Sequence, residues 1–191
     1  MPIPDDELIA HIRGGATHLY ARIVDRYKDR AMTLAARMLR NREDAEEATQ
    51  DAFVRAYNAL ETFKGNAKFS TWLYRIVYNV CLSRLGRRKS EFVTVDYDEG
   101  KDYDGIISSS SEPDAAAFER KDLIAFVHRC IDVLPEKYST MLSLFYVQEL
   151  SHEEIVDVTQ LPLGTVKVRL FRARGLLQES LRKEFQLKKA V

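Results

Sequence analysis

The side chains best suited to chemistry lie on a basic helix near the C-terminus. We expect this helix to run from Gly164 to about Phe185, after a break at Gln160 and a short helix that Ser151 caps. Glu154, three residues beyond Ser151, completes a capping-box pattern. A short helix, a tight turn and a longer basic helix are typical of a helix-turn-helix unit. The positions predicted to pack inward are apolar and spaced by three or four residues: Val166, Leu170, Ala173 and Leu177.

The remaining surface of this helix carries groups that DNA recognition uses. Lys and Arg donate to O6 and N7 of guanine in the major groove, and Thr or backbone N–H groups hold phosphate. The same pattern also fits the solvated face of an ordinary helical bundle, because basic helices are common. Spacing alone leaves both interpretations open. The outward residues are Thr165, Lys167, Val168, Phe171, Arg172 and Gly175.

A second distinctive segment, residues 63–79, interleaves aromatic and basic side chains beside Gly65. This composition suits single-stranded DNA, because bases stack on aromatic rings while Lys and Arg follow the phosphates. The alternative is that Phe69, Trp72 and Ile76 are core residues, and for Trp72 we favour that interpretation.

A third group is acidic. The stripe from Ala45 to Leu60 predicts a helix that Asn41 or Asp44 caps, with acids in its first turn. Its outward acidic face either meets a basic partner or, as is usual for such faces, is solvated. The opposite side is a stripe of mostly small residues that permits close helix contact: Ala45, Ala48, Ala52, Ala56 and Leu60.

Patterns of enzymes and metal sites are missing from this sequence. Residues 149–152 form a single ExxH, whereas a di-iron bundle needs two copies and further carboxylates. No P-loop, HExxH, GxSxG or metal-spaced cysteine set is present. Cys81 and Cys130 are predicted to be reduced, partly buried thiols. We therefore expect a protein that is not an enzyme and that uses no cofactor or metal.

Composition favours a soluble globular protein, with 46% hydrophobic and 30% charged residues among 191. The longest apolar runs fall far below the roughly 20 residues that a membrane helix needs. The N-terminus is acidic, whereas a signal peptide is basic. We expect a cytoplasmic location.

The zero net charge of the chain conceals three different segments. Residues 1–90 carry 16 Lys or Arg against 11 Asp or Glu, residues 91–118 carry one against eight, and residues 119–191 carry 12 against 10. The acidic stretch is rich in Gly and Ser and lacks helical periodicity, which predicts a flexible linker. Its apolar residues indicate that it docks on something: Phe92, Val93, Tyr97, Tyr103, Ile106 and Ile107.

The flanking blocks predict an all-α fold of two helical domains. In the first, residues 6–13 form a helix ended by Gly14-Gly15, and a helix near Ser70 follows a loop at residues 64–67. In the second, we expect helices at 118–134, 136–149, 151–158 and 164–185. The domain boundaries are 1–90 and 115–191, with the flexible acidic linker at 91–114. A long helix between residues 19 and 38 has a regular apolar stripe: Leu19, Ile23, Tyr27, Ala31, Leu34 and Met38.

The second block closely resembles region 4 of sigma factors. The resemblance rests on LPEKY (134–138), ELSHEEI (149–155) and PLGTVKVRLFRAR (162–174). Three positions depart from the family pattern: Val156 replaces Ala, Gln160 replaces Gly, and Ser139 replaces an Arg that touches phosphate. The resemblance implies that the minus-thirty-five promoter element is read by Thr165, Lys167, Val168, Phe171 and Arg172.

The first block resembles sigma region 2 over nearly its whole length, through NREDAEEATQDAF (41–53) and FKGNAKFSTWLYRIVYN (63–79). The resemblance implies a minus-ten reader, in which Phe63 and Asn79 line a pocket for a base turned out of the duplex. The implied minus-ten set is Phe63, Lys64, Asn79, Arg75, Arg84, Arg87 and Arg88. The implied contact with core polymerase is made by Asp44, Glu47, Gln50, Asp51 and Phe53.

Both domains in this order resemble a sigma factor of the extracytoplasmic-function (ECF) type, of the sigma-70 family. The resemblance implies a factor that binds core RNA polymerase, recognises promoter DNA and melts it, and serves a stress or envelope regulon under an anti-sigma factor. The linker would thread through the polymerase towards its active-site and RNA-exit channels. Two rivals remain: a dimeric helix-turn-helix regulator that binds operators without polymerase, and a helical scaffold whose basic helix binds another protein.

Overall fold

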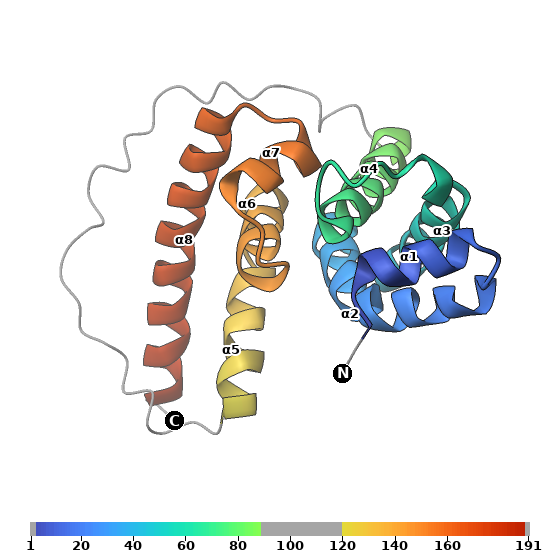
Figure 1. The fold of residues 1–191 in the computed structure, drawn as a ribbon. Coiled ribbons are helices and arrows are strands. Elements are labelled where there is room, and N and C mark those ends of the chain that lie inside the picture. Colours follow the sequence, from blue (N-terminus) through green and yellow to red (C-terminus); the bar gives the residue numbers. More distant parts are fainter. Residues whose placement is uncertain (1–2, 89–119, 190–191) are drawn as a thin grey trace.

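The computed structural model describes residues 3–88 and 120–189, and every regular element in these ranges is helical. The helices form two groups that lie side by side (Figure 1). This confirms the predicted helical class and its two helical regions. No helix in the described ranges is long and apolar enough to cross a membrane. The linker predicted at 91–114 lies outside the described residues.

The N-terminal group follows the predicted apolar stripes closely. Gly14 ends the first helix, and Gly15 has a φ of 101°, a conformation that glycine adopts without a steric cost. The stripe from Ile23 to Met38 is buried along the second helix. The helices are α1 (Asp5–Arg13), α2 (Tyr20–Leu39), α3 (Arg42–Asn58) and α4 (Phe69–Arg88), with short 3-10 turns η1 (Thr17–Leu19) and η2 (Leu60–Thr62).

The junction between α2 and α3 decides which residue caps α3. Arg40 ends α2 in the left-handed region, with a φ of 54°. The Asn41 side chain then accepts a hydrogen bond from the backbone N–H of Asp44 at 3.0 Å. Asn41 is therefore the N-cap, and Asp44 lies in the first turn, where its charge favours the helix dipole.

The C-terminal group departs from prediction at one place. Residues 136–149 were expected to form one helix, but α6 ends at Leu142 and the next five residues form a π-helical turn. In this turn the Gln148 N–H donates to the Ser143 carbonyl at 3.0 Å, five residues back. The wider turn buries Leu144 fully, and no residue type in the sequence marks it. The elements are α5 (Arg120–Asp132), α6 (Glu136–Leu142), η5 (Ser143–Val147), α7 (His152–Thr159) and α8 (Leu163–Lys189).

The main hydrophobic core does not stop at the boundary between the two groups. One cluster of buried residues includes Ile23 and Leu73 of the N-terminal helices together with Met141, Leu144 and Ile155. In Figure 1, α7 lies beside the N-terminal part of α4, and contacts also join α2 to α6. A second, smaller cluster fills the space between α5, α6 and α8: Ile131, Leu134, Leu142 and Ala173.

The turn between α7 and α8 gives a stability prediction. Gln160 has a φ of 58°, which costs an L-residue about 1–2 kcal/mol, and its amide donates to the Asp157 carbonyl at 2.8 Å in partial compensation. Gln160→Gly should raise the free energy of unfolding by about 0.5–1 kcal/mol, measured by urea denaturation. Gln178→Gly, the same change at an exposed position within α8, should lower it by about 1 kcal/mol. If the free energy of unfolding falls equally in both variants, the left-handed turn carries no strain.

Candidate nucleic-acid and polymerase interfaces

Helices α7 and α8 form a helix-turn-helix unit whose first helix is firmly capped. The Glu154 N–H donates to the Ser151 hydroxyl at 3.2 Å, and the Glu154 carboxylate accepts from the Ser151 N–H at 2.8 Å. The predicted capping box is therefore confirmed. An N-cap of this kind stabilises a helix by about 1 kcal/mol. The first three predicted inward positions of α8 are at most 1% exposed: Val166, Leu170 and Ala173.

The outward side of α8 carries the residues predicted to contact the minus-thirty-five element. Val168 is 49% exposed and Phe171 is 55% exposed, and Lys167 is exposed beside them. Thr165 and Arg172 are half-buried on the same first turns. The structure thus brings all five residues together on consecutive turns of one helix. Such a row can present a cation and apolar atoms to base edges in a major groove.

Phe63 occupies a more buried place than its predicted role requires. Its side chain is 7% exposed, and its ring centroid lies 5.6 Å from that of Phe69 and 5.2 Å from that of Trp72. Phe69 is 2% exposed, and Trp72 is half-buried against the core, as the core interpretation predicted. In this structure the Phe63 ring therefore packs inward against Phe69 and Trp72.

Arg13 of α1 holds the backbone beside this aromatic cluster. Its guanidinium donates to the Leu60 carbonyl, at 3.2 Å from Nε, and to the Phe63 carbonyl. The two acceptors belong to the stretch that leads into the loop before α4. Sequence reasoning missed Arg13, because a contact across 47 residues leaves no local pattern. The loop is thus positioned by a helix far from it in sequence.

Helix α4 carries the other residues predicted for the minus-ten element. Arg75 and Asn79 are exposed one turn apart, and Lys64 is exposed in the preceding loop. The Arg84 guanidinium lies 3.0 Å from the Glu47 carboxylate of α3, so this ion pair joins the two predicted sites. Arg87 and Arg88 belong to α4 by backbone, but their side chains lie outside the described residues.

The acidic face of α3 is continuous. Glu47 and Gln50 are exposed, and half-buried Asp51 pairs with Arg55 at 3.0 Å. Asp44, also half-buried, begins this face. The remaining predicted member, Phe53, is 7% exposed and its ring packs in the core.

Two exposed apolar residues of α3 extend this surface, and sequence reasoning missed both. Val54 is 59% exposed and follows Glu47 by seven residues, which places both on one helical face. Tyr57 is 39% exposed, and its ring lies 4.9 Å from that of Tyr20. The seven-residue spacing between Glu47 and Val54 was the feature of the sequence that could have placed Val54 on the acidic face.

Comparison with known proteins identifies this arrangement. Residues 23–91 match the family model for sigma-70 region 2, and residues 127–177 match the model for sigma-70 region 4. The chain is 38% identical over 178 residues to the ECF RNA polymerase sigma factor SigW of Bacillus subtilis, covering 91% of this chain and 95% of the relative. The chain belongs to the ECF sigma factors of the sigma-70 family. Members of this family are transcription initiation factors and not catalysts. The ECF RNA polymerase sigma-E factor of Escherichia coli K12 is 32% identical over 184 residues, 94% of this chain and 95% of that one.

Solved structures show the same fold at lower identity. The sigma factor RpoE of Bartonella quintana, in complex with the anti-sigma factor NepR, superposes with a TM-score of 0.62 at 23% identity, covering 85% of this chain and 96% of that one. CnrH in complex with the cytosolic domain of CnrY superposes with a TM-score of 0.60 at 21% identity, covering 92% of this chain and 96% of that one.

In this ECF sigma factor a region 4 carboxylate lies on the region 2 loop. The Glu154 carboxylate is 3.0 Å from Lys68 Nζ and accepts from the Thr71 hydroxyl at 3.3 Å. Burial tends to raise the pKa of Glu154. The hydrogen bond from the Ser151 N–H and the contacts with Lys68 and Thr71 outweigh burial, so the pKa is lowered and Glu154 stays anionic.

The two thiols of this sigma factor are shielded. Cys81 is 0% exposed and Cys130 is 1% exposed, so both thiols are free and fully buried, whereas partial burial was predicted. Burial raises the pKa of Cys81 to about 12 and also raises that of Cys130. Since the thiolate is the reactive form, both side chains are poor nucleophiles. Within the described ranges, no group of three or more His, Cys, Asp or Glu side chains could hold a metal ion.

Proposed function

We propose that this ECF sigma factor divides its work among three surfaces. The acidic face of α3 binds core RNA polymerase, the outward row of α8 reads the minus-thirty-five element, and the 63–68 loop with α4 reads and melts the minus-ten element. We also propose that the domains end at the predicted boundaries, 1–90 and 115–191. The acidic linker at 91–114 would then suit a basic channel of the polymerase.

The observation that carries this proposal is the exposed row on α8. Val168 and Phe171 are large apolar side chains that are half exposed beside Lys167, on the second helix of a helix-turn-helix unit. Apolar side chains contact the thymine methyl group, and a neighbouring cation donates to guanine. A row that combines both groups on a capped, rigid unit supports direct readout of base edges.

The polymerase surface rests on charge and apolar exposure together. Glu47, Gln50 and Asp51 supply anionic and polar groups, while Val54 and Tyr57 supply apolar area on the same helix. Protein interfaces combine an apolar centre with a polar rim in this way. A basic partner surface that also offers an apolar depression fits this face.

The minus-ten surface rests on Asn79, Arg75 and Lys64, which are exposed around the aromatic cluster. An Asn side chain can pair with the edge of an extruded base, and the cations can follow phosphates. In this conformation the Phe63 ring is buried against Phe69 and Trp72, and a role in covering the base requires the ring to move.

We further propose that an anti-sigma factor restrains this protein in the cytoplasm. The related RpoE of Bartonella quintana was solved with the anti-sigma factor NepR, and the related CnrH was solved with the cytosolic domain of CnrY. Purification of the tagged chain from its own cells, before and after envelope stress, tests for such a partner.

The recognition helix is tested by Arg172→Ala. If Arg172 reads a base, the variant should lose about 1–3 kcal/mol of binding at the preferred minus-thirty-five sequence and much less at a scrambled one. The measurement is titration of the polymerase holoenzyme on both DNAs. Arg174→Ala is the matched control, because Arg174 stacks on Phe145 of its own domain at 5.0 Å.

Equal weakening on both DNAs, with a salt dependence shallower by about one unit of slope, would assign Arg172 to a phosphate and not to a base.

A further inference from the structure

We propose that Arg13 is a positioning residue for promoter melting, because its hydrogen bonds to the Leu60 and Phe63 carbonyls keep the 63–68 loop in the shape that receives the opened minus-ten strand. This inference rests on the proposed role of that loop and α4 in reading the minus-ten element. It adds a residue of α1 to the melting machinery, and this residue acts through the loop backbone and not by touching DNA.

The 63–68 loop has little structure of its own to fix its shape. Every residue from Lys64 to Lys68 is exposed, and no backbone hydrogen bond joins residues 64–67 to another part of the chain that the structure describes. Gly65, with a φ of 72°, adds the residue type that has the widest choice of backbone conformations. The shape of the loop is therefore set where its two ends enter the folded domain.

The C-terminal end of the loop is fixed by α4. Phe69, the first residue of α4, is 2% exposed, and its ring centroid lies 5.6 Å from that of Phe63 and 5.5 Å from that of Trp72. The Trp72 N–H donates to the Lys68 carbonyl at 3.1 Å and so continues the helical pattern back to the loop. This end is held by the helix and the core together.

The N-terminal end of the loop is fixed by Arg13. Phe63 leaves the turn η2 in an extended conformation, with a φ of −68° and a ψ of 111°. Arg13 Nε donates to the Leu60 carbonyl at 3.2 Å, and its Nη2 donates to the carbonyls of both Leu60 and Phe63. Arginine side chains commonly bind the last carbonyls of a helical turn in this way. One planar guanidinium thus joins the start of η2 to the start of the loop.

Arg13 can serve as a fixed support because α1 is anchored along its length. The Asp5 carboxylate, in the first turn of α1, accepts a hydrogen bond from the Tyr27 hydroxyl of α2. Arg13 itself is exposed, so its truncation removes the carbonyl contacts and empties no core position. The buried side chains of α1 are at most 5% exposed and belong to the main core: Leu8, Ile9 and Ile12.

The contact has a consequence for melting because it is made to main-chain oxygens and not to the Phe63 ring. The ring can turn about its side-chain torsion while the Phe63 backbone stays in place. A loop with fixed ends also loses less conformational entropy when a DNA strand orders it, and such preorganisation strengthens binding without a new contact. The single strand exists only once the duplex opens, so Arg13 should affect opening and not docking.

The first test uses the free chain, in which Trp72 is the only tryptophan. Its ring centroid lies 5.2 Å from that of Phe63, so release of the Phe63 backbone should expose it. Arg13→Ala should raise acrylamide quenching of the Trp72 fluorescence about twofold and leave the helical circular dichroism signal unchanged. Arg13→Lys should fall between Arg13→Ala and wild type, because an ammonium group cannot reproduce the guanidinium fork.

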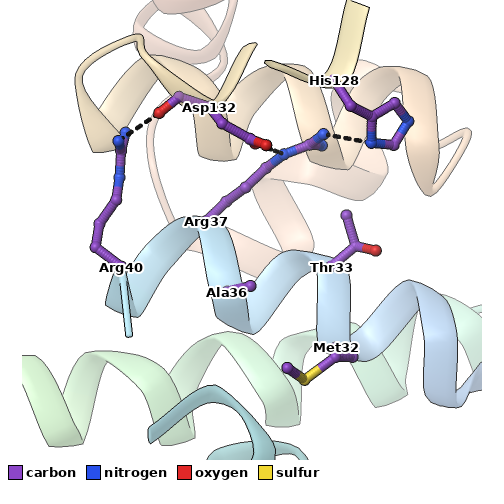
Figure 2. Close-up of a pocket in the computed structure, with 7 residues that line it drawn as sticks. All are labelled: Met32, Thr33, Ala36, Arg37, Arg40, His128 and Asp132. Carbon is purple, nitrogen blue, oxygen red and sulfur yellow. Dashed lines mark hydrogen bonds and ion pairs between the residues drawn. The ribbon is translucent and has the colours of Figure 1, made fainter. Parts of the chain in front are cut away.

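Arg40 provides a matched control, because it makes the same kind of contact elsewhere. It donates to the carbonyls of Asp132 and Leu134, beside the pocket between α2 and α5 (Figure 2). Arg40 has a φ of 54°, so Arg40→Gly removes the guanidinium without straining the backbone. This variant should match wild type in Trp72 quenching and in promoter opening. If it raised quenching as much as Arg13→Ala does, general loosening of the fold would be the cause, and the inference would be overturned.

The second test adds core polymerase and promoter DNA. Arg13→Ala should slow open-complex formation about threefold to tenfold, measured as permanganate reactivity over time. Binding to core polymerase and to the closed promoter should stay at the wild-type level. A promoter mismatched around the minus-ten element should recover much of the lost rate, because the opening cost is already met. A role in folding alone predicts equal losses on matched and mismatched promoters, and that result would overturn the inference.

Lys64→Ala separates this inference from the proposed function of the loop. Slow opening in Lys64→Ala with normal opening in Arg13→Ala would overturn the inference and leave the proposed function in place. If both variants open promoters slowly, the double variant should lose less than the product of the two single losses, because both residues act through one loop. Normal opening in Lys64→Ala and in Asn79→Ala would defeat the proposed reading of the minus-ten element and the melting role of Arg13 with it. Trp72 quenching would still decide whether Arg13 fixes the loop, and a wild-type value in Arg13→Ala would show that it does not.

Discussion

Replacing both Glu47 and Asp51 with lysine should weaken association with core polymerase by about a hundredfold or more. Both carboxylates lie on the α3 face proposed to meet a basic surface. Reversal places like charges against the partner, and juxtaposed like charges at an interface cost several kcal/mol. In the wild type Glu47 pairs with Arg84 and Asp51 with Arg55, so both arginines will also lose a partner. The measurement is competition with the unaltered chain for core polymerase.

A matched control separates partner binding from folding. Asp25→Lys with Asp29→Lys makes the same charge change at exposed positions of α2. It should leave association with polymerase close to the wild-type level. Both double variants should retain the helical circular dichroism signal, because each lost ion pair lies at the surface with at least one largely exposed partner, and such pairs contribute little to stability. If the variant with lysine at both Glu47 and Asp51 binds core polymerase as well as the wild-type chain does, α3 is not the contact surface.

The second large effect concerns promoter opening. Asn79→Ala should leave closed-complex binding nearly unchanged and reduce permanganate-reactive thymines near the start site by about tenfold. Asn79 is exposed on α4 one turn beyond Arg75, where it can pair with an extruded base. Such capture offsets an unstacking cost of a few kcal/mol, and that cost arises only as the duplex opens. A promoter mismatched around the minus-ten element should therefore recover much of the lost activity.

Asn58→Ala, at an exposed position near the end of α3, is the control and should melt promoters normally. Phe63→Ala is a poor test of base capture, because it would empty a core position and destabilise the fold by about 3–5 kcal/mol. If Asn79→Ala impairs duplex binding and gains nothing from a mismatched promoter, Asn79 supports docking and not base capture.

Sequence reasoning succeeded where the signal is local. The stripe along α2, the small-residue face of α3 and the capping box at Ser151 each follow from spacings of three or four residues, and all three are present. The outward positions of α8 followed from the same periodicity. These features are set by residues within one or two turns of each other, so a single sequence contains them.

The features that sequence reasoning missed depend on distant partners. Glu154 and Lys68 are 86 residues apart, and nothing in the local pattern of either predicts the other. Phe63 is a core residue because Phe69 and Trp72 close over it. The π-helical turn after α6 accompanies tertiary packing that local propensity does not encode.

The most direct test of this account is run-off transcription by core polymerase over a library of genomic fragments, with and without the chain. We predict new transcripts only when the chain is added, from start sites that share two upstream elements at a fixed separation. Footprints on those fragments should require chain and polymerase together. Unchanged start sites with the chain added, or equal protection of the DNA by the chain alone, would contradict its assignment as a promoter-specificity subunit.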